Sequence, residues 1–238
     1  MLELRNVVKH YQVGKGDPIR ALDGVSLTVA AGEIVALYGP SGSGKTTLTE
    51  IIAAKERADS GTVFVDGQDI AGLSGGDLDE YRLKQIGVVA SPEMMLPGIK
   101  AIKTASIRLL LSKAREANAT IEPLMIQLGL GGRLDHRTEE LSMGERQRVM
   151  IARALSTEPR LVLADEPTGS LDTDRTVEVL QMLRESCAER GVTVLLATHD
   201  LMVASFADHI HELRDGRLQE YQPRYSLVPI ADTDRQHA

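Results

Sequence analysis

The residues with the most specific chemical pattern occupy positions 39–46, where the sequence reads Gly-Pro-Ser-Gly-Ser-Gly-Lys-Thr. This order fits G-x-x-x-x-G-K-[ST], in which glycines let the backbone curl until successive N–H groups point at phosphate oxygens. The Lys45 ammonium can then lie between the β- and γ-phosphates, and the Thr46 hydroxyl can ligate Mg²⁺. The pattern predicts a nucleotide-binding loop made of Gly39, Pro40, Ser41, Gly42, Ser43, Gly44, Lys45, Thr46 and Thr47.

A second chemical pattern is the pair of adjacent carboxylates, Asp165 and Glu166, at the end of the apolar run 161–164. Neighbouring side chains on a strand point in opposite directions, so two adjacent acids can address two different atoms. Asp165 is therefore the candidate Mg²⁺ ligand, acting through water, and Glu166 is the candidate base that polarises an attacking water. A strand that ends in Asp-Glu is common by itself, and it gains weight from the phosphate loop that precedes it.

The kind of nucleotide is narrowed by what the chain lacks. A guanine site of the GTPase type needs an Asn-Lys-x-Asp sequence. The chain contains two asparagines, Asn6 and Asn118, and neither is followed by lysine. The GTPase interpretation is therefore excluded.

These residues must be held by strands and helices, and the hydrophobic pattern indicates where those lie. Apolar runs at 34–38, 161–164 and 192–197 are typical of strands buried on both faces. Strands that alternate with helices predict an α/β fold with a mostly parallel sheet. Alternating strands are further expected near 2–8, 25–29 and 62–65, and helices near 77–84, 100–130, 149–155, 173–190 and 201–206.

Composition limits the class of protein. The 238 residues are 42% hydrophobic and 26% charged, which predicts a packed core rather than disorder. A net charge of −7 argues against nucleic acid as a partner. Cys187 is the only cysteine, which suits a reducing compartment, and the start has neither a basic region nor an apolar one of the signal-peptide kind. The apolar runs are too short to cross a bilayer, so we expect a cytoplasmic protein.

The sequence 141–148, Leu-Ser-Met-Gly-Glu-Arg-Gln-Arg, leads into a helix-forming stretch and resembles the signature of the ATP-binding-cassette ATPases, Leu-Ser-Gly-Gly-Gln. The resemblance runs from about residue 2 to about residue 220, and positions 164–172 look closest to the ATPases of macrolide exporters, lipoprotein-release complexes and the FtsE-type division protein. It implies a P-loop NTPase (RecA-like) core with an antiparallel β subdomain. A helical subdomain at about 92–155 would be inserted into an ATPase domain spanning 1–221, followed by a tail at 222–238.

The same resemblance implies roles for further residues and partners. Tyr11 stands where the family stacks an aromatic ring on adenine, and His199 where it contacts the γ-phosphate. Asp172 belongs to the D-loop, and the signature residues Ser142, Met143, Gly144 and Glu145 would act in trans. The implied function is an Mg²⁺-dependent ATPase that pairs head to tail with a second copy, or a related cassette, around ATP. It would drive a separate integral membrane permease-type protein from the inner face of the cell membrane.

The chain departs from the family pattern at Ser91, which stands where the family has a glutamine that reaches toward Mg²⁺ and the attacking water. Serine is too short for that reach without a bridging water, so its metal role stays open. Met143 replaces the first signature glycine, at a cost of about 1 kcal/mol or more if the position needs a positive φ. Glu145 replaces glutamine, which suits a helix start but brings negative charge toward a triphosphate. We expect a functional ATPase with altered rate or coupling.

The membrane partner is expected to dock near Ser91–Pro97, a loop that carries the apolar triplet Met94-Met95-Leu96. The alternative for this triplet is that its methionines fill the core of the helical subdomain. Two functions are alternatives to an ATPase that drives transport. A cassette acting on DNA or ribosomes would carry coiled coils or a second cassette, which this chain lacks. An ATP-gated signalling module acting through a membrane protein stays open, since it uses the same cassette.

Overall fold

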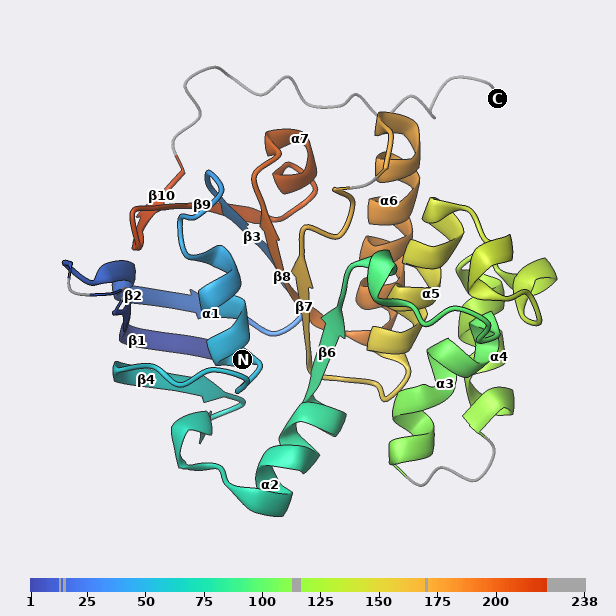
Figure 1. The fold of residues 1–238 in the computed structure, drawn as a ribbon, viewed down its shortest axis with the longest axis horizontal. Coiled ribbons are helices and arrows are strands. Elements are labelled where there is room, and N and C mark those ends of the chain that lie inside the picture. The colour runs from blue at the N-terminus through green and yellow to red at the C-terminus, as the bar shows by residue number, and fades with distance from the viewer. Residues whose placement is uncertain (13, 15, 113–116, 170, 222–238) are drawn as a thin grey trace, which may run out of the picture.

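The structure is a computed structural model, and it describes residues 1–12, 14, 16–112, 117–169 and 171–221. The predicted tail at 222–238 and Ser170 of the D-loop lie outside the described residues. Two sheets and a group of helices form the molecule (Figure 1). No helix within the described ranges is both long enough and apolar enough to cross a bilayer.

The smaller sheet is antiparallel and has the strand order β2-β1-β4-β5. Its first strand, β1, shows the predicted alternation at Leu2 and Leu4, and a register shift between Leu4 and Val7 keeps Val7 buried as well. This sheet is the antiparallel β subdomain that the resemblance implies. Its strands are β1 (Leu2–Tyr11), β2 (Ile19–Val29), β4 (Ser60–Val65) and β5 (Gln68–Asp69).

The larger sheet has the order β10-β9-β3-β8-β7-β6 and is parallel from β9 to β6. Only its edge pair, β10 and β9, is antiparallel. The predicted α/β fold with a mostly parallel sheet and a P-loop NTPase core is therefore confirmed. The strands are β3 (Ile34–Tyr38), β6 (Ile86–Val89), β7 (Leu161–Asp165), β8 (Thr193–Thr198), β9 (His209–Arg214) and β10 (Arg217–Glu220).

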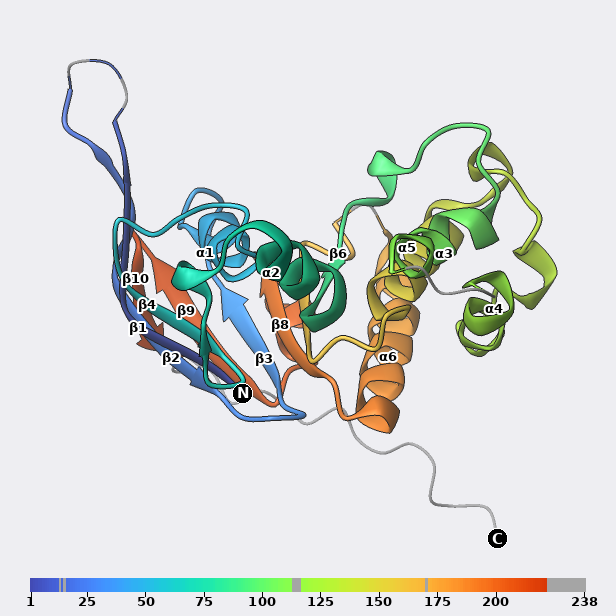
Figure 2. The same ribbon diagram turned by 90° about the horizontal axis from the view of Figure 1, so that it is seen from below.

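Helices cover both faces of the larger sheet. In Figures 1 and 2, α1 lies on one side of strands β6 to β8, and α3 to α6 lie on the other. The stretch predicted as helical at 100–130 contains two helices, and that at 77–84 contains the end of α2 and a π-helical turn (Tyr81–Gln85). The helices are α1 (Lys45–Ile52), α2 (Gly75–Glu80), α3 (Ala101–Leu111), α4 (Ala117–Gln127), α5 (Met143–Leu155), α6 (Thr173–Arg190) and α7 (Leu201–Ala204), with 3-10 turns at Ile70–Gly72, Pro92–Met94, Gly131–Arg133 and Thr138–Glu140.

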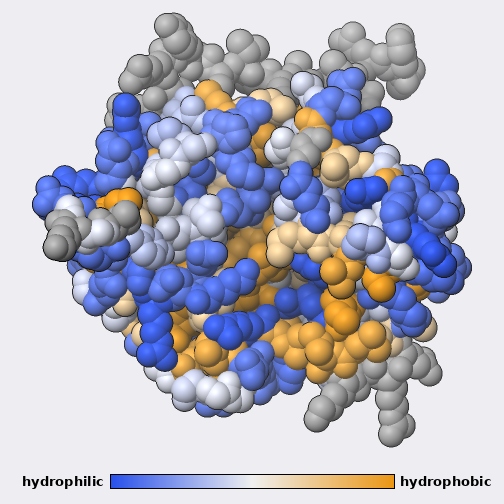
Figure 3. Space-filling view, in the orientation of Figure 1, coloured by the Kyte–Doolittle hydropathy of each residue, from blue (hydrophilic) through white to orange (hydrophobic). Residues whose placement is uncertain are grey.

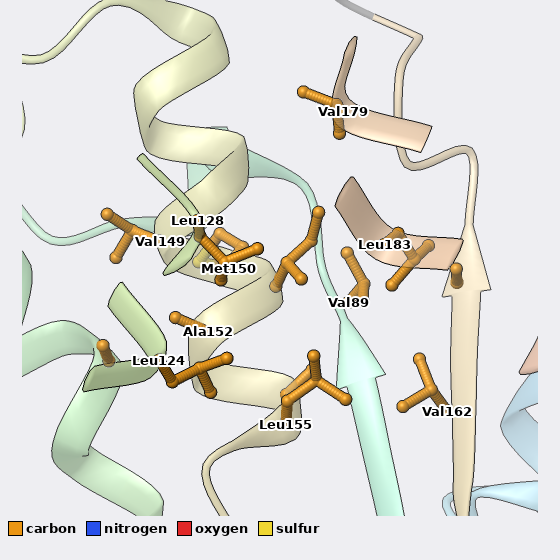
Figure 4. Close-up of a cluster of buried hydrophobic side chains, with 14 of the residues drawn as sticks. Val89, Leu124, Leu128, Val149, Met150, Ala152, Leu155, Val162, Val179 and Leu183 are labelled. Atoms are coloured by element: carbon orange, nitrogen blue, oxygen red, sulfur yellow. The ribbon is translucent and has the colours of Figure 1, made fainter. Parts of the chain in front are cut away.

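The larger sheet separates two hydrophobic cores, and β7 contributes to both. Leu161 and Leu163 pack into the core that contains α1 and the antiparallel sheet. Val162 and Ala164 pack on the opposite face, against the helical elements. Figure 4 shows this second core, in which side chains of α4, α5 and α6 meet Val89 and Val162 of the sheet. This packing fixes the carboxyl end of β7, where the two acids stand.

The loop that leads into the helical subdomain splits the methionine triplet. Met94 is 68% exposed and Leu96 is 69% exposed. Met95 is only 5% exposed and belongs to the hydrophobic core between the larger sheet and the helices that cover it. The surface interpretation is therefore wrong for Met95, because the 3-10 turn Pro92–Met94 ends there and sends neighbouring side chains in opposite directions.

Candidate active site

The phosphate loop joins β3 to α1, and its backbone requires glycine at two points. Gly44 has φ of 106°, and a Cβ there would lie 2.1 Å from the carbonyl oxygen of Ala21. A Cβ on Gly39 would lie 2.1 Å from the carbonyl oxygen of Leu213. No side chain caps the start of α1, so its first N–H groups stay available to an anion.

Lys45, the first residue of α1, is 6% exposed. Its Nζ donates to the carbonyl oxygens of Gly39, at 2.7 Å, and Pro40, at 3.0 Å. An ammonium has three donors, so one remains for a phosphate oxygen. Burial lowers the pKa of Lys45, and the charges of Glu166 and Asp165 partly offset this. A phosphate would stabilise the charged form that burial disfavours.

Asp165 ends β7 and accepts a hydrogen bond from Thr46. Burial raises the pKa of this carboxyl group, and the charge of Glu166 raises it further. Asp165 and Thr46 line a pocket of about 230 Å³ together with Ser91. The pocket therefore brings together the three residues for which the sequence suggested a metal role.

Glu166 and His199 are brought together at the carboxyl ends of β7 and β8. The register that pairs Asp165 with Ala197 places Glu166 beside the residues that follow β8. Oε1 of Glu166 lies 2.7 Å from Nδ1 of His199 and accepts from the backbone N–H of His199 at 2.9 Å. Glu166 has φ of 46°, so the chain turns sharply here. These contacts fix the orientation of the carboxylate.

The second oxygen of this carboxylate has a partner that sequence reasoning did not assign. Thr198 Oγ1 donates to Oε2 of Glu166 at 3.1 Å. Thr198 is 1% exposed. The sequence offered one clue: Thr198 directly follows an apolar run and precedes His199. Because parallel strands end at one edge of their sheet, Thr198 could be expected near Glu166, which follows another such run.

The signature residues form the start of α5. Ser142 and Glu145 form a capping box: Glu145 accepts from the Ser142 N–H at 2.7 Å, and Ser142 Oγ accepts from the Glu145 N–H at 3.3 Å. Met143 is helical and has no positive φ, so the backbone strain considered for it does not arise. Gly144 is the second helical residue.

The charge of Glu145 has a local partner. Its Oε1 lies 2.6 Å from Nε of Arg133. Burial alone would raise the pKa of Glu145, but hydrogen bonds from Arg133 and Ser142 outweigh it and lower the pKa to about 2. The negative charge that replaces glutamine is therefore balanced within the chain.

Two further predicted site residues have other contacts. Asp172 caps the start of α6 by accepting from the Arg175 N–H at 3.0 Å. Tyr11 ends β1 and has the Lys9 ammonium 5.2 Å from its ring centre. The signature also lies apart from the phosphate loop, because α5 and α1 stand on opposite sides of β6 to β8 (Figures 1 and 2). One chain therefore does not bring Ser142 to its own Lys45.

The phosphate loop, the two acids and the sheet define a nucleotide-hydrolysing α/β protein, and comparison with known proteins agrees. The family profile of the ABC transporter matches residues 22–169. The lipoprotein-releasing system ATP-binding protein LolD 2 of Caulobacter vibrioides is 41% identical over 221 residues, which cover 92% of this chain and 96% of the relative. The macrolide export ATP-binding/permease protein MacB of Rhodopirellula baltica is 40% identical over 224 residues, covering 92% of this chain. The chain spans 33% of that longer relative.

A solved structure also resembles this chain. The dimeric, post-hydrolysis ATP-binding cassette MJ0796, bound to ADP and Pi, is 32% identical with a TM-score of 0.83. The alignment covers 93% of this chain and 99% of that chain. The chain belongs to the ABC transporter family. Its predicted class, an ATPase subunit that forms a dimeric cassette and works with a membrane partner, is confirmed, and the signalling alternative is not favoured.

Proposed function

We propose that the chain is the ATPase subunit of an export or extrusion complex, and that Glu166 is the base for ATP hydrolysis. This role rests on the way in which the Glu166 carboxylate is held. Three donors, from Thr198 and from the backbone and ring of His199, hold it at the sheet edge where Asp165 and Lys45 stand. A carboxylate so oriented can polarise a water for attack on the γ-phosphate.

The remaining residues would bind and orient ATP. The backbone of 39–44 and the uncapped start of α1 would hold the phosphates, with Lys45 between the β- and γ-phosphates. Thr46 and Asp165 would hold Mg²⁺, which would neutralise charge developing on the phosphates. One hydroxyl and one carboxylate suit an ion that takes its other ligands from phosphates and water. Tyr11 would stack on adenine.

A second copy would complete each site. Ser142 and the N-terminus of α5 would face the γ-phosphate bound by the other chain, because they lie apart from the phosphate loop of their own chain. The Ser142 hydroxyl accepts from Glu145 and keeps its own proton to donate. Asp172 would stand at the same junction. Binding of ATP would then join the two chains, and hydrolysis would release them.

The relatives named for lipoprotein release and macrolide export suggest a cargo with a lipid or large apolar part. The membrane partner would contact that cargo, and this chain would lie at the inner face of the membrane through that partner. Docking would occur near Ser91–Pro97, where Met94 and Leu96 are exposed.

The Glu166→Gln variant tests the assignment. It keeps the shape of the side chain but removes the base, so we expect turnover to fall about 10²-fold or more, with ATP affinity little changed and an ATP-bound dimer accumulating. The Lys45→Ala variant should instead lose nucleotide affinity. Glu122→Gln, an exposed change on α4, is the matched control. Steady-state ATPase assays, nucleotide titration and size-exclusion chromatography measure the outcome, and a wild-type rate for Glu166→Gln would show that another group is the base.

A further inference from the structure

Arg175 belongs to α6, yet its side chain lies against the signature at the start of α5. In Figures 1 and 2, α5 and α6 lie side by side. Cδ of Arg175 is 3.8 Å from the point where a Cβ on Gly144 would stand. One turn further along both helices, Nη1 of Arg148 lies 3.2 Å from Oε1 of Glu178. This ion pair holds the two helices in the register that keeps Arg175 beside Gly144.

The position of Arg175 is unfavourable for α6 itself. Asp172 caps this helix, so Arg175 is its third residue. The partial positive charge at a helix N-terminus disfavours a cation in the first turn, and a capping box has glutamate or glutamine at this position. α5 follows that rule, because Glu145 is its third residue. A residue that opposes the local preference of its helix is expected at a functional site.

The charge of Arg175 is weakly engaged within one chain. Its Nε lies 3.5 Å from Oδ2 of Asp172, and the two side chains are 55% and 59% exposed. An exposed ion pair of this kind contributes little to stability. Glu145 is the only acid in α5, and it already has Arg133 as its partner. Arg175 can therefore exchange Asp172 for an anion outside the chain.

The surroundings of Arg175 indicate which anion that is. Ser142 and Gly144 belong to the start of α5, which the proposed function places at the γ-phosphate of ATP on a second chain. Arg175 lies against Gly144 and so belongs to the same junction. Exposed apolar side chains gather instead over β6 and α3 (Figure 3), so contact at this junction depends on charge. A guanidinium presents paired N–H groups that match the oxygens of a phosphate.

We propose that Arg175 is a further phosphate-binding residue of the site that two copies complete, and that its guanidinium turns from Asp172 to the γ-phosphate of the ATP held by the second copy. The inference rests on the proposed function, because it assumes that two copies close around ATP. Oδ1 of Asp172 accepts from the backbone N–H of Arg175 at 3.0 Å. This bond does not involve the guanidinium, so α6 stays capped while the side chain turns.

The variant Arg175→Gln tests the proposal in a Glu166→Gln parent, in which an ATP-bound dimer should accumulate. Size-exclusion chromatography over a series of ATP concentrations measures dimer formation. Binding of a fluorescent ATP analogue to dilute, monomeric chain measures the affinity of one phosphate loop. We expect the ATP concentration at half-maximal dimerisation to rise about tenfold or more, and the monomer affinity to stay within about twofold.

Thermal unfolding and matched variants separate this contact from a structural role. Removing a cation from the first turn of α6 should not lower the Tm of the nucleotide-free chain. Arg175→Lys keeps a point charge, so its loss of dimerisation should be about threefold or less. Arg214→Gln, a change of an exposed arginine on β9, is the matched control. Added salt should weaken the parent dimer more than the Arg175→Gln dimer, because the variant lacks one ionic contact.

Unchanged dimerisation of Arg175→Gln, or equal losses in Arg175→Gln and Arg214→Gln, would overturn the proposal. A fall in Tm that accompanies the loss would assign Arg175 a structural role, and an equal loss of monomer affinity would assign it to the phosphate loop of its own chain. A parent that retains its ATP and stays monomeric would also overturn it, since the contact exists only between two chains.

Failure of the proposed function gives a different result. The Glu166→Gln parent would then form ADP at the wild-type rate, which is measured in the same samples. The comparison of Arg175→Gln with its parent is in that case made with a non-hydrolysable ATP analogue, and the same outcomes decide it.

Discussion

The two neighbouring methionines of the loop at 91–97 should respond in different ways to the same substitution. Met95 is 5% exposed and packs in the core between the larger sheet and its helices, whereas Met94 is 68% exposed and lines the pocket that contains Thr46 and Asp165. The single variants Met94→Ser and Met95→Ser therefore separate stability from partner binding. A double substitution would confuse the two effects.

The magnitudes follow from burial. Truncating a buried methionine to alanine costs about 2–5 kcal/mol, and a serine adds a buried hydroxyl, so we expect about 3 kcal/mol or more for Met95→Ser. In a chain of this size each kcal/mol lowers Tm by about 2–4 °C. Met95→Ser should therefore lower Tm by about 6–12 °C. Met94→Ser should change the free energy of unfolding by about 0.5 kcal/mol or less, and Tm by about 2 °C at most.

Calorimetry or thermal fluorescence on the isolated chain measures stability, and ATPase stimulation in the reconstituted complex measures partner binding. Met94→Ser should keep basal activity and lose most of the stimulation, whereas the folded fraction of Met95→Ser should still respond to the partner. Equal losses of Tm in the two variants would refute the reasoning, because they would mean that Met94 is also packed. Full stimulation of Met94→Ser would show that the partner does not contact this side chain.

Two more predictions concern the departures from the family pattern. Ser91→Gln places a longer polar side chain in the pocket that holds Thr46 and Asp165. Basal ATPase activity should therefore rise severalfold, or reach half of its maximum at a lower Mg²⁺ concentration. An Mg²⁺ titration in which neither the rate nor the half-saturating concentration changes would show that position 91 takes no part in hydrolysis. Glu145→Gln removes the charge paired with Arg133 and should cost about 1 kcal/mol near pH 7. Because folding lowers the pKa of Glu145 from 4.5 to about 2, this difference should shrink as pH falls below about 4.5 and vanish only below about pH 2. Urea midpoints of both proteins measure it, and a difference that grows in acid would contradict the prediction.

The sequence predicts best where strong local patterns agree with the tertiary fold. The apolar run at 34–38 became β3 with the same ends, and the helix expected at 173–190 became α6. Asp172 accepts at the start of this helix, and Gly191, with φ of 62°, ends it. Glu166 and His199 could also be expected together, because parallel strands end at one edge of a sheet.

Other features depend on tertiary contacts that have no local pattern. The periodicity at 100–130 did not reveal the break between α3 and α4. Nothing in a loop sequence tells which of two adjacent methionines is buried, since that depends on where the 3-10 turn ends. The same holds for the ion pair of Arg133 with Glu145, which arises from packing of elements that no local pattern connects.

The phosphate site brings together opposite charges in surroundings that disfavour the charged form of each group. Burial lowers the pKa of Lys45 and raises the pKa of Asp165, so each group is less stable in its charged form than it would be in water. A triphosphate beside Lys45 and a cation beside Asp165 would each stabilise the charged form. Binding of nucleotide and cation would therefore offset part of the free energy that burial costs these two groups. Because α5, which begins at the signature, lies on the other side of β6 to β8 from α1, a second chain would complete the site, and nucleotide binding would then be coupled to assembly.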